Sequence, residues 1–101
     1  MAKNQEHAAQ LGSAWALHRK GQNDEAVREF TALLQMSANN IDALYGLGLS
    51  QRSGGHRAAA EEAFTTCLKQ IDGALAEHPN EDRYEMLQKM TKQRLDELKD
   101  K

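Results

Sequence analysis

The side chains best suited to metal binding or covalent catalysis in this sequence are four histidines and one cysteine. His7 and His18 are eleven positions apart, which corresponds to about 16 Å along a helix. No His or Cys pair has the spacing of a zinc site. No glycine-rich phosphate loop or nucleophile–base triad is present either. We therefore expect no catalytic residue, no metal, no cofactor and no enzymatic activity.

The composition predicts a small helical protein. Of 101 residues, 28% are charged with a net charge of −2, 40% are hydrophobic and only 5% are aromatic. A nearly balanced charge gives no general attraction to nucleic acid or to an anionic membrane. A single cysteine cannot form an internal disulfide, and no apolar run approaches the roughly 20 residues of a membrane span. We expect one domain, residues 1–101, in the cytoplasm.

An internal repeat with a period of 34 residues organises the chain. Five pairs of similar residues share this separation: Ala14 and Gly48, Gly21 and Gly55, Ala26 and Ala60, Phe30 and Phe64, and Leu33 and Cys67. A constant period of this length is typical of helical repeat proteins, in which each unit is one pair of helices.

Apolar spacing and helix breakers predict five helices. Gly21 suits a left-handed turn after the first helix, and Asn23 and Asn40 suit helix N-caps. Asn80, with Glu81 and Asp82, is expected to open the fifth helix. Pro79 interrupts the last stretch of helical composition. The expected helices cover residues 6–19, 24–37, 41–53, 56–77 and 81–99.

These residues resemble the tetratricopeptide repeat family. Gly55, Ala60 and Phe64 stand where the family has its turn glycine, its helix-crossing alanine and its aromatic core residue, and Gly21, Ala26 and Phe30 match in the first unit. The resemblance implies an all-α fold of antiparallel helical hairpins. It places repeat one at about 7–40, repeat two at about 41–74, and an extended helix end with a capping helix at about 75–101.

The resemblance also implies a peptide-binding groove lined by the first helix of each repeat. Carried over by position, its residues are Leu11, Trp15, His18, Arg19, Asp42, Tyr45, Leu49 and Arg52. The expected partner is a protein or peptide segment with apolar anchors and acidic flanks. Trp15 has two open interpretations, as a groove residue or as part of the core. Leu11, Trp15 and Gly46 replace the Lys and Asn residues with which some family members bind a terminal carboxylate.

The last helix is expected to cap the stack. One side of it carries Tyr84, Met86, Leu87, Met90, Leu95 and Leu98, which we expect to be buried against the fourth helix. Two repeats are fewer than the three usually needed for a continuous core. An alternative function is therefore self-assembly, in which the same apolar faces form a homodimer.

Overall fold

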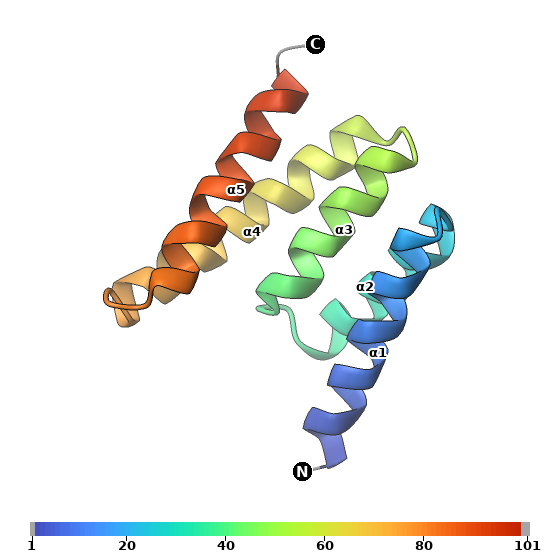
Figure 1. The fold of residues 1–101 in the computed structure, drawn as a ribbon, viewed down its shortest axis with the longest axis horizontal. Coiled ribbons are helices and arrows are strands. Elements are labelled where there is room, and N and C mark those ends of the chain that lie inside the picture. Colours follow the sequence, from blue (N-terminus) through green and yellow to red (C-terminus); the bar gives the residue numbers. More distant parts are fainter. Residues whose placement is uncertain (1, 100–101) are drawn as a thin grey trace.

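The computed structural model describes residues 2–99, and the side chains of residues 8–99. Within that range the chain is all-α, with five helices and no strand (Figure 1). The helices are α1 (Ala2–Arg19), α2 (Asn23–Met36), α3 (Ile41–Ser53), α4 (Arg57–Glu77) and α5 (Asp82–Lys99). The predicted number, order and approximate limits of the helices are confirmed.

Two glycines form the tight turns inside the helical hairpins. Gly21 between α1 and α2 has φ of 81°, and Gly55 between α3 and α4 has φ of 85°. Residues with a Cβ adopt this left-handed conformation only at a steric cost. The backbone N–H groups that follow, at Gln22 and His56, donate back to the carbonyls of Leu17 and Gln51. The 34-residue spacing of the two glycines therefore reproduces the same helix ending twice.

The helix caps follow the sequence prediction only in part. Asn40 caps α3, because its Oδ1 accepts a hydrogen bond from the backbone N–H of Ala43 at 3.1 Å. The prediction that Asn23 caps α2 is wrong. Gln22 occupies the N-cap position without a side-chain hydrogen bond, and Asn23 is the first helical residue, with its Oδ1 buried and unpaired.

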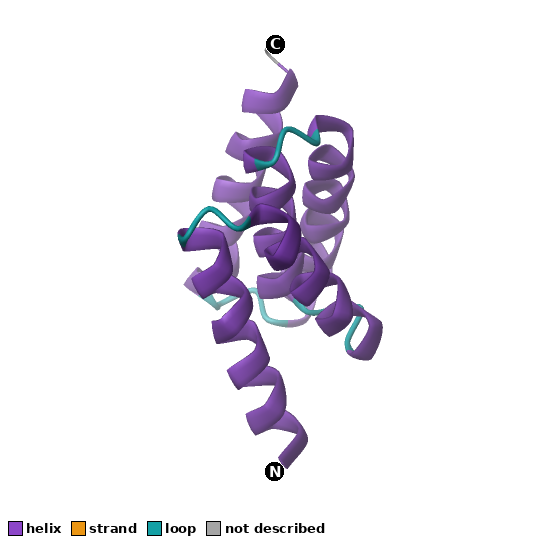
Figure 2. Ribbon diagram, turned by 90° about the vertical axis from the view of Figure 1, so that its right-hand side faces the viewer, coloured by secondary structure: helices purple, strands orange, loops and turns teal. Residues whose placement is uncertain are grey.

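The five helices form two layers. α1, α3 and α5 make up the nearer layer in Figure 1, and α2 and α4 lie behind them. Each helix packs against its neighbour in sequence, and α1 also packs against α3. Figure 2 shows the same arrangement from the side, with short loops between the helices. We call the surface of α1, α3 and α5 that faces away from α2 and α4 the inner face.

The core consists of two clusters that meet at α3. The first contains Ala14, Ala26, Phe30, Leu33 and Ala43. The second contains Leu44, Tyr45, Ala60, Phe64, Cys67, Ile71, Leu95 and Leu98. Trp15 and Leu34 are partly buried and pack against both clusters, so the first hairpin and the rest of the chain share one continuous apolar interior.

Two glycines on α3 receive the two phenylalanine rings of the repeat. A Cβ added to Gly46 would overlap the ring of Phe30, and a Cβ added to Gly48 would lie 2.6 Å from the ring of Phe64. Both rings are fully buried. The small residues on this helix therefore allow α2 and α4 to approach α3 from both sides.

The predicted extension of α4 and the packing of α5 against it are present. α4 has 21 residues and α2 has 14, and the extra length carries the buried Ile71. Leu95 and Leu98 of α5 share a core cluster with it. The expected burial of the methionines is wrong, because Met86 is 63% exposed and Met90 is 37% exposed.

Candidate functional site

The eight residues of the predicted groove lie on two adjacent helices of the inner face. Leu11, Trp15, His18 and Arg19 belong to α1, and Asp42, Tyr45, Leu49 and Arg52 belong to α3. The two helices are linked by Ser50 Oγ and His18 Nδ1, which are 3.3 Å apart. Leu11, Trp15 and Leu49 are partly exposed, so apolar surface is accessible on both helices.

Trp15 contributes to both the core and the surface. Its ring meets Phe30 edge-on, with centroids 5.3 Å apart, and meets His18 edge-on at 5.8 Å. Such aromatic pairs add about 0.5–1.5 kcal/mol beyond the burial of their area. The indole is nevertheless only partly buried. The two interpretations of this residue are therefore compatible, since one part of the ring packs inward and another remains open to solvent.

Tyr45 lies beneath the surface rather than on it. Its side chain is 9% exposed, and its ring packs against Phe64 with centroids 5.7 Å apart. Leu95 and Leu98 of α5 belong to the same cluster. Burial raises the pKa of the Tyr45 hydroxyl. In this conformation the ring supports the inner face from below, and its neighbour Leu49 is the more accessible residue of the pair.

Arginine side chains surround one end of the inner face. Arg52 Nη1 donates to Glu97 Oε1 of α5 at 3.0 Å, and Arg94 Nη2 donates to Glu97 Oε2 at 3.2 Å. Two guanidinium groups thus share one carboxylate, which leaves an excess positive charge. Arg19 is exposed nearby on α1. We call Arg19, Arg52 and Arg94 the cationic end.

The surroundings of His18 lower the pKa of its imidazole. Partial burial lowers the pKa of the imidazole, and the charges of Arg52 and Arg19 lower it further. A protonated His18 would be a third cation in the same region and would lose hydration. The ring is therefore mostly neutral at pH 7, able to exchange a hydrogen bond with Ser50 but not to add a full charge.

Asp42 lies away from the cationic end, at the start of α3. It lines a recess of about 200 Å³ together with Asn39, Asn40, Ile41, Arg83, Tyr84 and Leu87. Arg52 is ten residues further along the same helix, or about 15 Å. The predicted residues therefore do not converge on one point, as a catalytic centre requires, but extend over the length of two helices.

Four residues of the inner face were not predicted as site residues, and all lie on α5: Met86, Met90, Arg94 and Glu97. Glu97 pairs with Arg52, while Met86 and Met90 are among the exposed large hydrophobic residues. The 34-residue period could not identify them, because α5 begins 41 residues after α3 instead of 34. Counting from the first residue of each helix would have pointed to Met86 and Met90, which then correspond to Tyr45 and Leu49, whereas Glu97 has no counterpart among the predicted residues.

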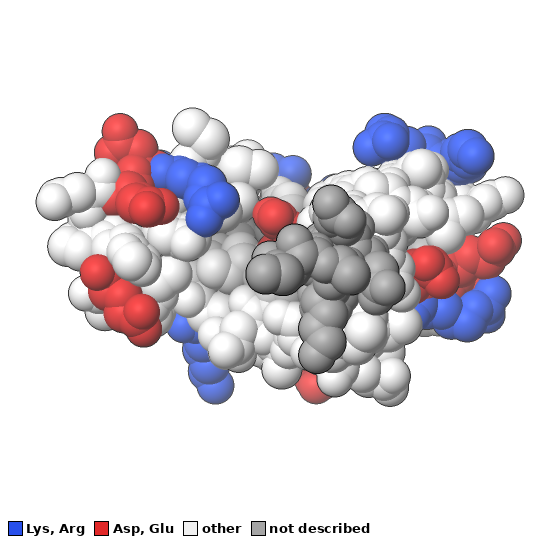
Figure 3. Space-filling view, turned by 90° about the horizontal axis from the view of Figure 1, so that it is seen from below, with Lys and Arg blue, Asp and Glu red and all other residues white. Residues whose placement is uncertain are grey.

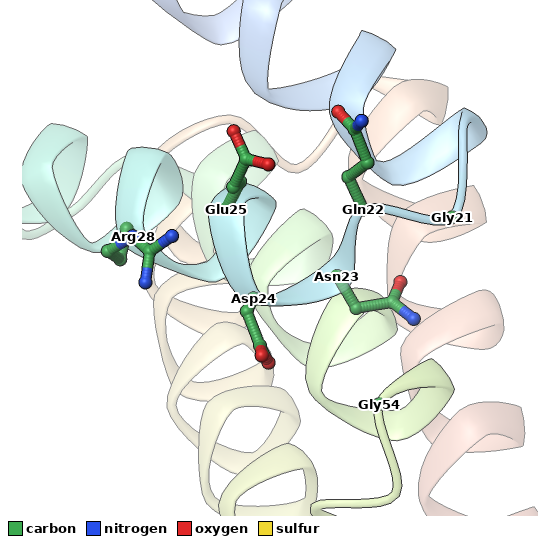
Figure 4. A pocket seen from close by; sticks show the side chains of 7 residues that line it. All are labelled: Gly21, Gln22, Asn23, Asp24, Glu25, Arg28 and Gly54. Carbon is green, nitrogen blue, oxygen red and sulfur yellow. The ribbon is translucent and has the colours of Figure 1, made fainter.

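The recess beside the turn between α1 and α2 has no convergent functional groups. It measures about 500 Å³ and lies between the α1–α2 turn and Gly54 (Figure 4). Figure 4 shows the side chains of Asp24, Glu25 and Arg28 pointing in different directions rather than toward one centre. Among the described residues, no group of three or more His, Cys, Asp or Glu side chains could hold a metal ion.

Cys67 is a core residue. Its side chain is fully buried, and its Sγ lies 3.7 Å from the carbonyl oxygen of Ile41, to which it donates. Burial raises the pKa of the thiol to about 11. Because the thiolate is the nucleophile, this environment disfavours reactivity.

Charges are mixed on the surface seen from below in Figure 3, where acidic and basic side chains occur together at both ends of the molecule.

Within residues 2–99, no helix has the length and apolar character needed to cross a bilayer.

One segment of the chain matches the model of a known protein family. Residues 42–70 match the family model described as tetratricopeptide repeat. The matched segment covers α3 and two thirds of α4, and it includes Tyr45, Leu49 and Arg52 of the inner face. No curated protein matches the chain.

Proposed function

From the premise that this chain is a tetratricopeptide-repeat protein, we propose that its inner face binds a segment of another protein. Repeats of this family generally mediate protein–protein interactions and are typically non-catalytic. The proposed role is that of an adaptor or scaffold. Leu11, Trp15 and Leu49 supply apolar contacts in this proposal, and His18, Arg19, Asp42 and Arg52 supply polar ones, with Tyr45 packed beneath.

The observation that carries the proposal is the position of accessible apolar side chains beside an excess of positive charge. Trp15 and Leu49 lie on adjacent helices and are half-buried, which holds them in fixed positions while leaving surface to cover. Arg52 and Arg94 share the single carboxylate of Glu97. Tryptophan and arginine are among the residue types that most often dominate the binding energy at protein interfaces.

The same observation defines the chemistry of the partner. Its segment carries aliphatic or aromatic anchors that cover Leu11, Trp15 and Leu49. It also carries a carboxylate that meets the cationic end, where an arginine can form a two-point hydrogen bond to it. A basic segment would be repelled, which provides specificity as well as affinity.

The experiment is a comparison of Leu49→Glu with Thr31→Glu. Both variants add one negative charge, but Thr31 is exposed on α2, in the other layer. Peptides selected from a random display library on the chain of residues 1–101 serve as ligands. Leu49→Glu is expected to weaken their binding at least about tenfold, which corresponds to 1.4 kcal/mol, while Thr31→Glu leaves it unchanged. If Leu49→Glu binds the peptides as tightly as Thr31→Glu does, the binding surface lies elsewhere.

Sedimentation of the chain alone tests the alternative of self-assembly. A dimer that dissociates in Leu49→Glu but not in Thr31→Glu would make the partner a second copy of this chain. A chain that stays monomeric at all concentrations tested would exclude self-assembly.

A further inference from the structure

The described side chains include three exposed large hydrophobic residues, and two of them are close together. Met36 is 55% exposed on α2, while Met86 and Met90 are 63% and 37% exposed on α5. Residues four apart on a helix lie on the same face. A single exposed methionine needs no explanation, but this pair forms a continuous apolar patch.

The hydrogen bonds of α5 show which way the patch faces. Met86, Met90, Arg94 and Glu97 follow one another at intervals of four, four and three residues, so they form one stripe along the helix. Glu97 pairs with Arg52 of α3. On another side of α5, Gln88 donates to Asp72 of α4 at 2.8 Å. The stripe that carries the two methionines therefore lies toward α3 and the inner face.

Met90 lies level with the predicted binding residues of α3. Met90 precedes Glu97 by seven residues, and Tyr45 precedes Arg52 by seven residues. α3 and α5 run in the same direction (Figure 1), so the contact between Arg52 and Glu97 brings Met90 beside Tyr45 and Leu49. Accessible apolar side chains thus occur on all three helices of the inner face, with Leu11 and Trp15 on α1, Leu49 on α3, and Met86 and Met90 on α5.

The width of this surface distinguishes the possible shapes of a partner. α1 and α3 pack against each other, at the roughly 8–10 Å typical of packed helices. The contact between Arg52 and Glu97 places α5 on the other side of α3 (Figure 1), so the accessible apolar side chains spread over more than one helix spacing. An extended strand is only about 5 Å wide between neighbours and sends alternate side chains away from the surface. An α-helix is about 10–12 Å across with its side chains, and its apolar stripe can contact all three helices.

The charges distinguish the ends of the partner. Arg52 and Arg94 surround Glu97 with an excess of one positive charge, and exposed Arg19 adds another. The carboxyl end of a helix carries the negative end of its dipole. A helix that places its C-terminal end and an acidic residue at the cationic end is therefore favoured by both charges.

We propose that the partner segment is an amphipathic α-helix that contacts Met86 and Met90 as well as α1 and α3, with acidic residues near its carboxyl end at Arg19, Arg52 and Arg94. This inference rests on the proposed function and specifies its ligand. Methionine suits such a contact, because its flexible thioether side chain adapts to partners of different shape.

The test uses the chain of residues 1–101 labelled with ¹³C at the methionine methyl groups. The probes are 16-residue peptides selected on it from a random display library. Binding is expected to shift the Met86 and Met90 methyl resonances and to leave Met36 unchanged. The selected sequences should have apolar residues at i, i+3 or i+4, and i+7, with Asp or Glu near the carboxyl end. The double variant Met86→Glu, Met90→Glu should bind them at least about tenfold more weakly, whereas Met36→Glu should bind normally.

The outcomes separate the two proposals. If Leu49→Glu abolishes binding but the Met86 and Met90 methyl resonances do not shift, α5 does not take part and only the further inference fails. The further inference also fails alone if the selected peptides show the alternating pattern of an extended strand. Binding that is insensitive to Leu49→Glu and to the double methionine variant would overturn both. Circular dichroism of each variant checks that it still folds. We expect both methionine substitutions to be tolerated, because the two side chains are exposed.

Discussion

Gly46 of α3 lies directly against the aromatic ring of Phe30 from α2, with no space for a Cβ between them. The ring is fully buried, so it cannot move aside into solvent. This contact limits how closely α2 and α3, and with them the two repeats, can approach each other. It also provides a sharp test of the packing.

We predict that Gly46→Ala destabilises the protein by about 1–3 kcal/mol, the usual cost of forcing extra volume into a packed core. Gly73→Ala is the matched control. Gly73 is exposed within α4, and a Cβ there would meet nothing within 4 Å. Because alanine is the better helix former, that variant should gain roughly 0.5–1 kcal/mol. Urea unfolding of both proteins measures the difference, and a stable Gly46→Ala variant would contradict the described packing.

We predict that Glu97→Gln strengthens binding of acidic peptides on the inner face. The carboxylate of Glu97 neutralises part of the charge of Arg52 and Arg94, and its removal makes both guanidinium groups available to a ligand. The pair is partly exposed, so stability should fall by no more than about 1 kcal/mol. Titration calorimetry with the selected peptides at low salt is the measurement. Asp96→Gln, an exposed neighbour on α5, is the control and should not change affinity.

We predict that His18 makes the folded protein less stable at mildly acidic pH. The folded-state pKa of His18 lies below its ordinary value of 6.5, so the unfolded chain binds the proton more readily. Stability is therefore highest above about pH 6.5 and declines as the pH falls below it. His18→Gln should reduce that decline. Thermal melting at pH 7.5 and pH 5.5 measures it, and an unchanged pH dependence in the variant would show that His18 does not contribute.

We predict that Cys67 reacts with a thiol reagent only when the protein unfolds. The side chain is fully buried, and its pKa is raised to about 11, so the thiolate is scarce and inaccessible in the folded state. The rate of modification should follow the fraction unfolded along a urea series. Rapid reaction in native buffer would show that α5 opens from α4 much more easily than the packing indicates.

The helices could be predicted from the sequence because the signals that define them are local. Glycines at 21 and 55 and the asparagine at 40 act through their own backbone or the next turn. The cap of α2 was misplaced by one residue, because asparagine was assigned to the first position where its chemistry fits. N-cap propensity favours asparagine over glutamine, but neither side chain forms the capping bond here, so the preference indicates the wrong residue.

The site could be predicted only where it follows the repeat. Leu11, Trp15 and Leu49 are accessible on adjacent helices, as their positions in the repeat imply. The burial of Tyr45 depends on Leu95 and Leu98, which reach it from α5. The exposure of Met86 depends on which side of that helix meets α4. Both depend on the docking of a helix outside the 34-residue period, and no local pattern specifies that docking.

The spacing between α3 and α5 restricts how the length of this chain can change. α5 begins 41 residues after α3, seven more than the repeat period of 34. Seven residues are almost two complete helical turns, with a rotation error of only about 20°. Inserting or deleting one residue in the tail of α4 would instead turn everything beyond it by about 100°, which would carry Glu97 away from Arg52. Each added residue also moves the turn between α4 and α5 by about 1.5 Å along the axis of α4, so the present length of this tail sets the register in which Glu97 meets Arg52.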